Sequence, residues 1–436
     1  MNTVAPGPNG AFEGAPGPGG TLTLADFPLA GDNIVGSQGV VRADFNGLDL
    51  ASPLAMDDCT LVVETTFFPE RQVTGRNAPS VIMAAFNRDN FWDGRAKRDF
   101  NGVTPAGPED PSDPQIWVDD GNGLEQEDVV LSPGSPGSQA VGPPNNGVEM
   151  SCAGRSFSEL GRKLLNATPL GLQMVATNDS VLGAPLSAAP ANGLTTTYAA
   201  LIQAAFHPYL HASAGLTPDG YTQMEANFSL FWGIAVNLYE NTLIPNDSPY
   251  DKFKEGNAGA LTANQLAGLS VFLNKGRCIK CHGGPEFTKA SILNFSGGSA
   301  FANTGVTPTA ADGGRQPENK GKFKTPTVRN AELTGPYFHN GRYVTLRQVV
   351  DFYNRGGDVN NPDKHSDVRP LGLSVAQRNA LVDFMLGLTD NRVRMQQAPF
   401  DHPSLAPPNG SGLPAVGAGG AAAPLTPFLG ANHFSP

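Results

Sequence analysis

One pentapeptide, Cys278-Ile-Lys-Cys281-His282, constrains this chain more than any other feature of its sequence. Two thiols three positions apart, followed directly by a histidine, form the pattern of covalent haem c attachment. The thiols bind the haem through thioether bonds, and the imidazole becomes an iron ligand. A zinc site would need a second pair of ligands, but Cys59 and Cys152 are isolated. The pattern therefore predicts haem c and disfavours zinc.

Composition limits the partners of such a protein. The 436 residues carry a net charge of −11, which argues against binding to nucleic acid or to an anionic membrane surface. A basic redox partner would suit this charge, and so would an acidic surface with no partner. The 52 Gly and 38 Pro residues predict short helices joined by long irregular connections.

Haem is attached to this kind of motif outside the bacterial cytoplasm, so we expect a periplasmic protein. No run of apolar residues approaches the length of a membrane span. The first residues also lack the charged and apolar regions of a secretory signal. A periplasmic location and the lack of a secretory signal conflict. A chain that begins downstream of the true start would explain both.

Helical patterns are spread unevenly along the chain. Residues 1–40 and 101–147 have the composition of loops, whereas Met224 to Tyr239 has apolar residues at helical spacing and predicts one core helix. Further helices are indicated after Thr262, Thr345 and Ser374. The first and last of these residues begin capping boxes, Thr262-Ala-Asn-Gln265 and Ser374-Val-Ala-Gln377.

Several motifs in order resemble the bacterial di-haem cytochrome c peroxidase family, which includes the maturase of tryptophan tryptophylquinone. The resemblance covers about Leu22 to Pro403. The motifs are Gly75-Arg-Asn77-Ala-Pro79, Phe91-Trp92-Asp-Gly-Arg95-Ala, Gln139-x-x-x-Pro143-x-x-x-x-x-Glu149-Met150, Cys278-x-x-Cys281-His282, Thr325-Pro-Thr-Val-Arg329-Asn330 and Thr334-Gly-Pro336-Tyr-Phe-His339-Asn-Gly341.

The resemblance and the helical patterns together predict an all-α fold of two cytochrome c-like lobes with long irregular Gly/Pro-rich loops. The predicted units are residues 1–215, an N-terminal lobe of the peroxidatic type, and residues 216–403, a C-terminal lobe with covalent haem. Residues 404–436 are predicted to form a flexible tail, because they are rich in Pro, Gly and Ala.

The resemblance also implies roles in peroxide chemistry. Glu149 would be the acid/base that moves a proton between the peroxide oxygens, and Gln139 and Pro143 would shape its pocket. Trp92 would relay electrons between two haems. Taken alone, Glu149 reads as a solvated loop residue and Trp92 as a core residue.

Further roles concern the haem and a calcium ion. Asn77, with the carbonyls of Thr334 and Pro336, would bind calcium, which prefers hard oxygen ligands. His339 would hydrogen-bond a haem propionate or a water near the metal, and it could instead be an interface residue. Arg329 is counted with the cofactor-binding residues through its motif.

Tyr353 is predicted as the second axial ligand of the haem held by His282. Tyr353 occupies the position where many family members have methionine and the maturase has tyrosine. A phenolate ligand would favour oxidised iron. Met385 and Met395 are alternative ligands, and Tyr353 could also serve only in packing.

The sequence departs from the family at one point, since it holds no earlier Cys-x-x-Cys-His for the peroxidatic haem. Two haems are expected in the family and one motif is present. We interpret the chain as starting within the N-terminal lobe and expect it, as given, to be silent toward peroxide. A genuine one-haem descendant is the alternative. Cys59 and Cys152 could form a disulfide or remain two free buried thiols.

Together these features predict an oxidoreductase that reduces hydrogen peroxide with electrons from a small cytochrome c or cupredoxin. The family also implies a homodimer. Two alternatives remain: an electron-transfer cytochrome without peroxidase activity, and a maturase-like oxidase of a protein substrate.

Overall fold

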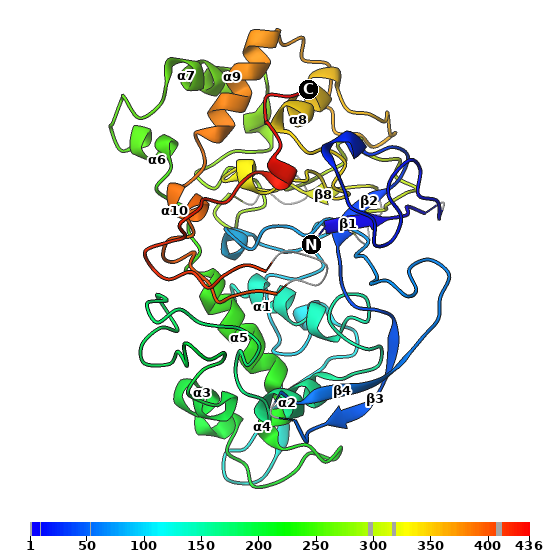
Figure 1. The fold of residues 1–436 in the computed structure, drawn as a ribbon, viewed down its shortest axis with the longest axis vertical. Helices are drawn as coiled ribbons and strands as arrows, with labels where there is room; N and C mark the ends of the chain where they lie inside the picture. Colours follow the sequence, from blue (N-terminus) through cyan, green and yellow to red (C-terminus); the bar gives the residue numbers. More distant parts are fainter. Residues whose placement is uncertain (1, 9, 53, 295–299, 316–319, 407–411) are drawn as a thin grey trace.

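The architecture is two stacked lobes joined along one side by the long helix α5, as Figure 1 shows. It is seen in a computed structural model, which describes residues 2–436 except 9, 53, 295–299, 316–319 and 407–411. The lower lobe holds α1 (Ser135–Ala140), α2 (Phe157–Leu165), α3 (Tyr198–Ala205), α4 (Gln223–Ala226), α5 (Phe228–Glu240), β3 (Ala43–Asp49), β4 (Met56–Leu61), β5 (Ile116–Val118) and β6 (Glu125–Glu127).

The upper lobe contains the second half of the chain and also the N-terminal strands. Its elements are α6 (Pro249–Lys254), α7 (Ala263–Leu273), α8 (Leu346–Arg355), α9 (Val375–Leu386), β1 (Asn2–Ala5), β2 (Ile34–Ser37), β7 (Phe301–Ala302) and β8 (Phe323–Lys324). The short helix α10 (Asn391–Arg394) lies between the lobes.

The prediction of an all-α fold is wrong. Only 26% of the protein is helical and 12% lies in strands. In the described part of the chain the strands form four separate antiparallel pairs, β1–β2, β3–β4, β5–β6 and β7–β8. Each pair is short, and most join segments that carry no alternating pattern. The fold is therefore mixed, with helices and small two-stranded sheets in both lobes.

The first strand pair places the N-terminal segment on the upper lobe. Val4 lies opposite Val35 in the β1–β2 ladder, and both are fully buried. The amide of Val35 donates to the carbonyl of Asn340 at 2.9 Å. The surface loop predicted over residues 1–40 is thus wrong for these strands. The lobe boundaries predicted at residues 215 and 403 stay predictions.

Helix starts in the upper lobe follow the predicted chemistry. The side chains of Thr262, Thr345 and Ser374 each accept a hydrogen bond from an amide three residues on, which caps α7, α8 and α9. Helices α7 and α9 then cross closely. A Cβ at Gly268 would lie 1.9 Å from the carbonyl oxygen of Ala380, so only glycine allows this approach.

The helix predicted from Met224 to Tyr239 is interrupted in the structure. It is divided at Asn227 into α4 and α5. The Asn227 side chain accepts from the amide of Trp117 at 2.8 Å and donates to the carbonyls of Trp117 and Leu210. Because these bonds tie Asn227 to other segments, they compete with a continuous helix.

The C-terminal segment returns to the upper lobe, as the red end of the chain in Figure 1 shows. His433 is buried, and its Nδ1 accepts from the amide of Leu346 at 3.3 Å while Nε2 donates to the carbonyl of Glu332 at 2.9 Å. The Thr345 hydroxyl donates to the carbonyl of Ser435 at 2.6 Å. These contacts place the end of the chain at the start of α8. The flexibility predicted for residues 404–436 stays a prediction.

Candidate functional site

A cavity of about 250 Å³ lies in the upper lobe against the boundary with the lower lobe. We call it the upper cavity. It brings together ten of the predicted site residues, which come from segments spread over more than 270 positions: Asn77, Trp92, Cys278, Cys281, His282, Arg329, Thr334, Pro336, His339 and Tyr353. Gln139, Pro143 and Glu149 are absent from its described lining, so the structure describes two separate sites.

The cysteine motif reaches the upper cavity through the end of α7. After Leu273 the chain turns, and the amide of Gly276 donates back to the carbonyl of Val271 at 2.8 Å. A short 3₁₀ helix, Cys278–Lys280, follows, and the amide of His282 donates to the carbonyl of Cys278 at 2.8 Å. This compact turn gives both thiols and the imidazole access to one cavity.

The imidazole of His282 is oriented by two carbonyl groups. Its Nδ1 lies 3.2 Å from the carbonyl oxygen of Phe287 and 3.0 Å from that of Pro326. A carbonyl only accepts hydrogen bonds, so Nδ1 carries the proton and Nε2 keeps a free lone pair. Burial lowers the pKa of His282, which favours the neutral ring. A neutral imidazole with a fixed tautomer is the form that binds a metal.

The walls near the motif suit a flat apolar macrocycle. Cys278 and Cys281 are not joined by a disulfide. Burial raises the pKa of the Cys278 thiol to about 12 and also raises that of Cys281, so both thiols are protonated. Apolar side chains from α7, α8 and α9 complete the walls, among them Phe272, Leu346, Val350, Leu381 and Met385. The residues present therefore fit haem c.

Tyr353 faces the same cavity from α8. Burial raises the pKa of its phenol, and the nearby thiols of Cys281 and Cys278 raise it further. The ring packs 5.0 Å from that of Phe352, measured between centroids. Tyr353 thus shares its cavity with the cysteine pair, and its role as an iron ligand stays a prediction. Of the two alternative ligands, Met385 lines the cavity and Met395 is absent from its described lining.

A group around Asn77 joins segments far apart in the sequence. The Asn77 amide group lies 2.7 Å from the Pro336 carbonyl oxygen, and the backbone amide of Asn77 donates to the carbonyl of His339 at 2.7 Å. The indole of Trp92 donates to the carbonyl of Asn77 at 2.6 Å. Thr334 lines the same cavity. Two of the three predicted calcium ligands, Asn77 and Pro336, are therefore in contact, and calcium binding stays a prediction.

His339 is an uncharged residue in this environment. Its ring is stacked on that of Phe323 with the centroids 3.6 Å apart, and Nε2 lies 3.5 Å from the Thr307 hydroxyl. Burial lowers the pKa of His339 to about 3, although Asp312 opposes the shift. At neutral pH His339 could offer a hydrogen bond to a carboxylate but no positive charge.

Arg329 lines the upper cavity, yet its guanidinium is engaged by protein groups. It makes a bidentate ion pair with Asp251 at 2.9 and 2.8 Å. It also donates to the carbonyls of Pro285 and Pro245. Because Pro285 follows the histidine of the motif by three residues, Arg329 in this structure supports the loop beyond His282.

The second site lies in the lower lobe. Gln139 is on α1, and Glu149 lies in the loop that follows the 3₁₀ helix Pro143–Asn145. Burial raises the pKa of Glu149, and the Arg95 guanidinium lowers it in part. Arg95 in turn lies 3.9 Å over the ring of Phe91. Sequence reasoning missed Arg95 as a functional residue, although it stands in the Phe91-Trp92-Asp-Gly-Arg95 motif.

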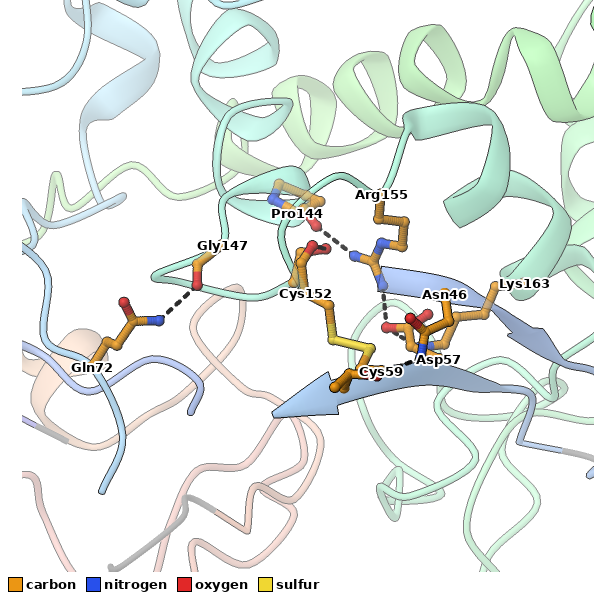
Figure 2. Close-up of a disulfide and its surroundings, with 11 residues drawn as sticks. Asn46, Asp57, Cys59, Gln72, Pro144, Gly147, Cys152, Arg155 and Lys163 are labelled. Atoms are coloured by element: carbon orange, nitrogen blue, oxygen red, sulfur yellow. Dashed lines mark hydrogen bonds and ion pairs between the residues drawn. A yellow bond between two sulfur atoms is a disulfide. The ribbon is translucent and has the colours of Figure 1, made fainter. Parts of the chain in front are cut away.

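A disulfide between Cys59 and Cys152 holds the Glu149 loop to strand β4, as Figure 2 shows. Contacts on both sides add to this link. Arg155 donates to Asp57 and to the carbonyl of Pro144, and Gln72 donates to the carbonyl of Gly147 at 2.8 Å. The loop that carries Glu149 is therefore held from two directions. Of the two alternatives left open by the sequence, the structure shows the disulfide.

The upper cavity thus defines the class of protein, a binder of covalent haem. Comparison with known families agrees, since residues 54–259 match the model of the di-haem cytochrome c peroxidase family. The matched segment includes Glu149 and ends before the cysteine motif. Over this segment the chain is similar to the di-haem cytochrome c peroxidase family.

Individual relatives match part of the chain. The cytochrome-c peroxidase IdrP2 of Denitromonas iodatirespirans is 34% identical over 178 residues, covering 35% of this chain and 47% of that protein. The methylamine utilization protein MauG of Methylorubrum extorquens is 28% identical over 153 residues, covering 35% and 42%. The cytochrome c551 peroxidase of Pseudomonas aeruginosa is 28% identical over 280 residues, covering 63% and 56%. The chain spans about half the length of the relatives it matches.

Proposed function

We propose that this protein is a c-type haem oxidoreductase which, together with a second haem, reduces hydrogen peroxide to water. The observation that carries the proposal is His282, whose Nδ1 is occupied by two carbonyls while two free thiols share its cavity. When bound, haem c supplies an iron that can exchange single electrons. Similarity to the di-haem peroxidase family supports peroxide as the electron acceptor.

The residues of the chain would divide the work between the two sites. In the upper cavity His282 and Tyr353 would both hold the haem iron, and the bound haem would supply electron transfer there. Trp92 lies at the boundary of the lobes and would carry electrons toward the peroxidatic haem of the family. At the second site the Glu149 carboxyl would take a proton from one peroxide oxygen and give it to the other.

Calcium is part of this proposal. The Asn77 amide and the carbonyls of Thr334 and Pro336 would supply neutral oxygen ligands, with water for the remainder. In the described part of the chain no group of three or more His, Cys, Asp or Glu residues is placed to hold a metal ion. A neutral ligand set of this kind predicts weak binding, so a chelator should remove the ion readily and loosen the contact between lobes.

Partners and location follow from the same proposal. A small cytochrome c or cupredoxin would donate the electrons, and the protein would work in the periplasm as a homodimer. No helix among the described residues is long and apolar enough to span a bilayer. Each hydrogen peroxide takes up two electrons and two protons and gives two waters. Two molecules of a one-electron donor should therefore be oxidised for each peroxide consumed.

A second candidate is a maturase-like oxidase or a simple electron-transfer cytochrome. The observation that favours it is Tyr353, which reaches the haem-motif cavity where a methionine would favour a higher potential. An electron-transfer role would leave Glu149 without a task, whereas its loop is held by a disulfide and several hydrogen bonds. We therefore rank peroxide reduction first.

The test combines haem quantitation with turnover. Pyridine haemochrome analysis should give one covalent haem per chain for the sequence as given, and a form with the family's second motif should give two. The form with two haems should also oxidise the electron donor at a steady rate when peroxide is added. Two haems without peroxide consumption would overturn the peroxidase proposal and leave the second candidate.

A further inference from the structure

Lys324 is a buried cation in the wall of the cavity that the cysteine motif also lines, and none of the functions above uses it. It is the last residue of β8, is only 5% exposed, and lines the upper cavity. Its backbone amide donates to the carbonyl of Trp92 at 2.7 Å, which fixes its place next to another residue of the cavity wall. Among the described residues no ion pair or side-chain hydrogen bond reaches its ammonium group.

The nearby charges do not balance Lys324. Asp89 is the acidic group that acts on it, but one Asp89 oxygen lies 3.5 Å from Nη1 of Arg315 and the other accepts from the amide of Arg98. Arg315 also lies 4.0 Å over the ring of Phe301, the ladder partner of Lys324. Two cations therefore share one carboxylate. Burial lowers the pKa of Lys324 to about 8, with Asp89 opposing the shift, so the ammonium is still mostly charged at neutral pH.

A buried ammonium without a counter-ion is costly, so the site calls for an anion. The cavity that Lys324 lines is the one that fits haem c, and haem carries two propionate carboxylates. The other candidates on the cavity wall are unsuitable. His339 is neutral, Arg277 is paired with Asp367, and the Arg329 guanidinium is engaged by Asp251 and two carbonyls. Lys324 is thus the cation in this wall that has no protein partner among the described residues.

We propose that Lys324 binds a propionate carboxylate of the haem attached at Cys278 and Cys281, and that its charge raises the reduction potential of that haem. This inference rests on the proposed haem site but not on peroxide turnover. A positive charge near the iron disfavours the oxidised state, whose charge is higher by one. The effect should be strong for a buried charge, because screening by water and salt is weak there.

Substitution of the charge tests the proposal. In Lys324→Met the side chain keeps its length and loses its charge, and the matched control Lys320→Met removes the same charge from an exposed side chain four residues earlier. Spectroelectrochemistry should show a lower midpoint potential for Lys324→Met and no comparable change for Lys320→Met. Resonance Raman spectra should show a shifted propionate bending band only in Lys324→Met. Lys324→Arg should restore both signals toward the wild type.

Each outcome separates this inference from the haem proposal. A Lys324→Met protein with full haem content, an unchanged propionate band and the potential of Lys320→Met would overturn the role of Lys324 alone. A wild-type protein without covalent haem would overturn the haem proposal itself. If Lys324→Met does not fold, Lys324→Gln keeps a polar head without charge and must lower the potential for the inference to stand.

Discussion

In the upper lobe, Cys278 and Cys281 stand three residues apart at the end of one helix and face a cavity as free thiols. In the lower lobe, Cys59 and Cys152 stand 93 positions apart and are joined to each other. The two upper cysteines are close together in the sequence, and their free thiols can bind a group other than each other. The lower pair spans a long segment and serves to position the Glu149 loop (Figure 2).

The comparison shows two ways of preparing a functional group. At His282 the orientation comes from carbonyls within the same lobe, and the reactive nitrogen is left free. At Glu149 the orientation comes from the tethering of a loop that has little regular structure. The upper site should therefore tolerate changes in distant segments, whereas the lower site should depend on them.

The largest expected effect separates the two cysteine pairs. Cys278→Ala with Cys281→Ala should abolish covalent haem, because no thioether can then form. Cys59→Ala with Cys152→Ala should leave the haem in place. Haem staining on denaturing gels and pyridine haemochrome analysis measure both. Covalent haem in the first double variant, or its loss in the second, would contradict the assigned roles.

The next effect concerns proton transfer in the lower lobe. In a form that turns over peroxide, Glu149→Gln should lower the turnover rate by ~10²–10⁴, since a positioned acid/base typically contributes that factor. Haem content should be unchanged. Glu125→Gln, on the exposed strand β6, is the matched control and should keep full activity. Undiminished turnover in Glu149→Gln would show that another group handles the proton.

Removing the disulfide should have a smaller effect, confined to one lobe. The link closes a loop of 93 positions, and loss of a native disulfide typically costs about 2–5 kcal/mol. In Cys59→Ala with Cys152→Ala we expect faster hydrogen exchange over residues 144–153 and a lower thermal midpoint. Exchange over residues 278–282 should not change, which serves as the internal control. Equal loosening of both segments would mean that the lobes are not independent in this respect.

The difference between the lobes also explains what the sequence could predict. The helix caps at Thr262, Thr345 and Ser374 and the turn at Cys278 depend on a few neighbouring residues, and the structure confirms these caps. The family motifs named ten residues that the structure brings to one cavity. Patterns of this kind are readable because their physical cause lies within a few positions of the chain.

The failures concern contacts between distant segments. Strand β1 pairs with β2 some 30 residues later, and β2 then contacts Asn340, so no local alternation marks either strand. The break at Asn227 arises from bonds to Trp117, which a helical pattern does not contain. Lys324 carries no sequence signal either, because its lack of a partner is a property of the folded cavity.

The smallest predicted effect tests how Arg95 controls Glu149. Burial raises the pKa of the Glu149 carboxyl and Arg95 lowers it in part, so Arg95→Gln should raise that pKa further. As the proton acceptor, Glu149 must be ionised, and a higher pKa means that a higher pH is needed to ionise it. The acidic limb of the pH–rate profile should therefore move to higher pH, while the rate on the plateau above both pKa values should change little.

Charge, and not packing, should decide this result. Arg95 also pairs with Asp93 at 3.1 Å, but Asp93 keeps its ion pair with Arg76 at 2.7 Å when Arg95 is replaced. Arg95→Lys retains the positive charge and loses the planar stacking on Phe91, so its acidic limb should stay near that of the wild type. A limb that moves equally in both variants would assign the effect to the stacking on Phe91. If the acidic limb moves in neither variant, the pKa of a group other than Glu149 sets that limb. The acid/base of the tethered lower site would then be a residue other than Glu149.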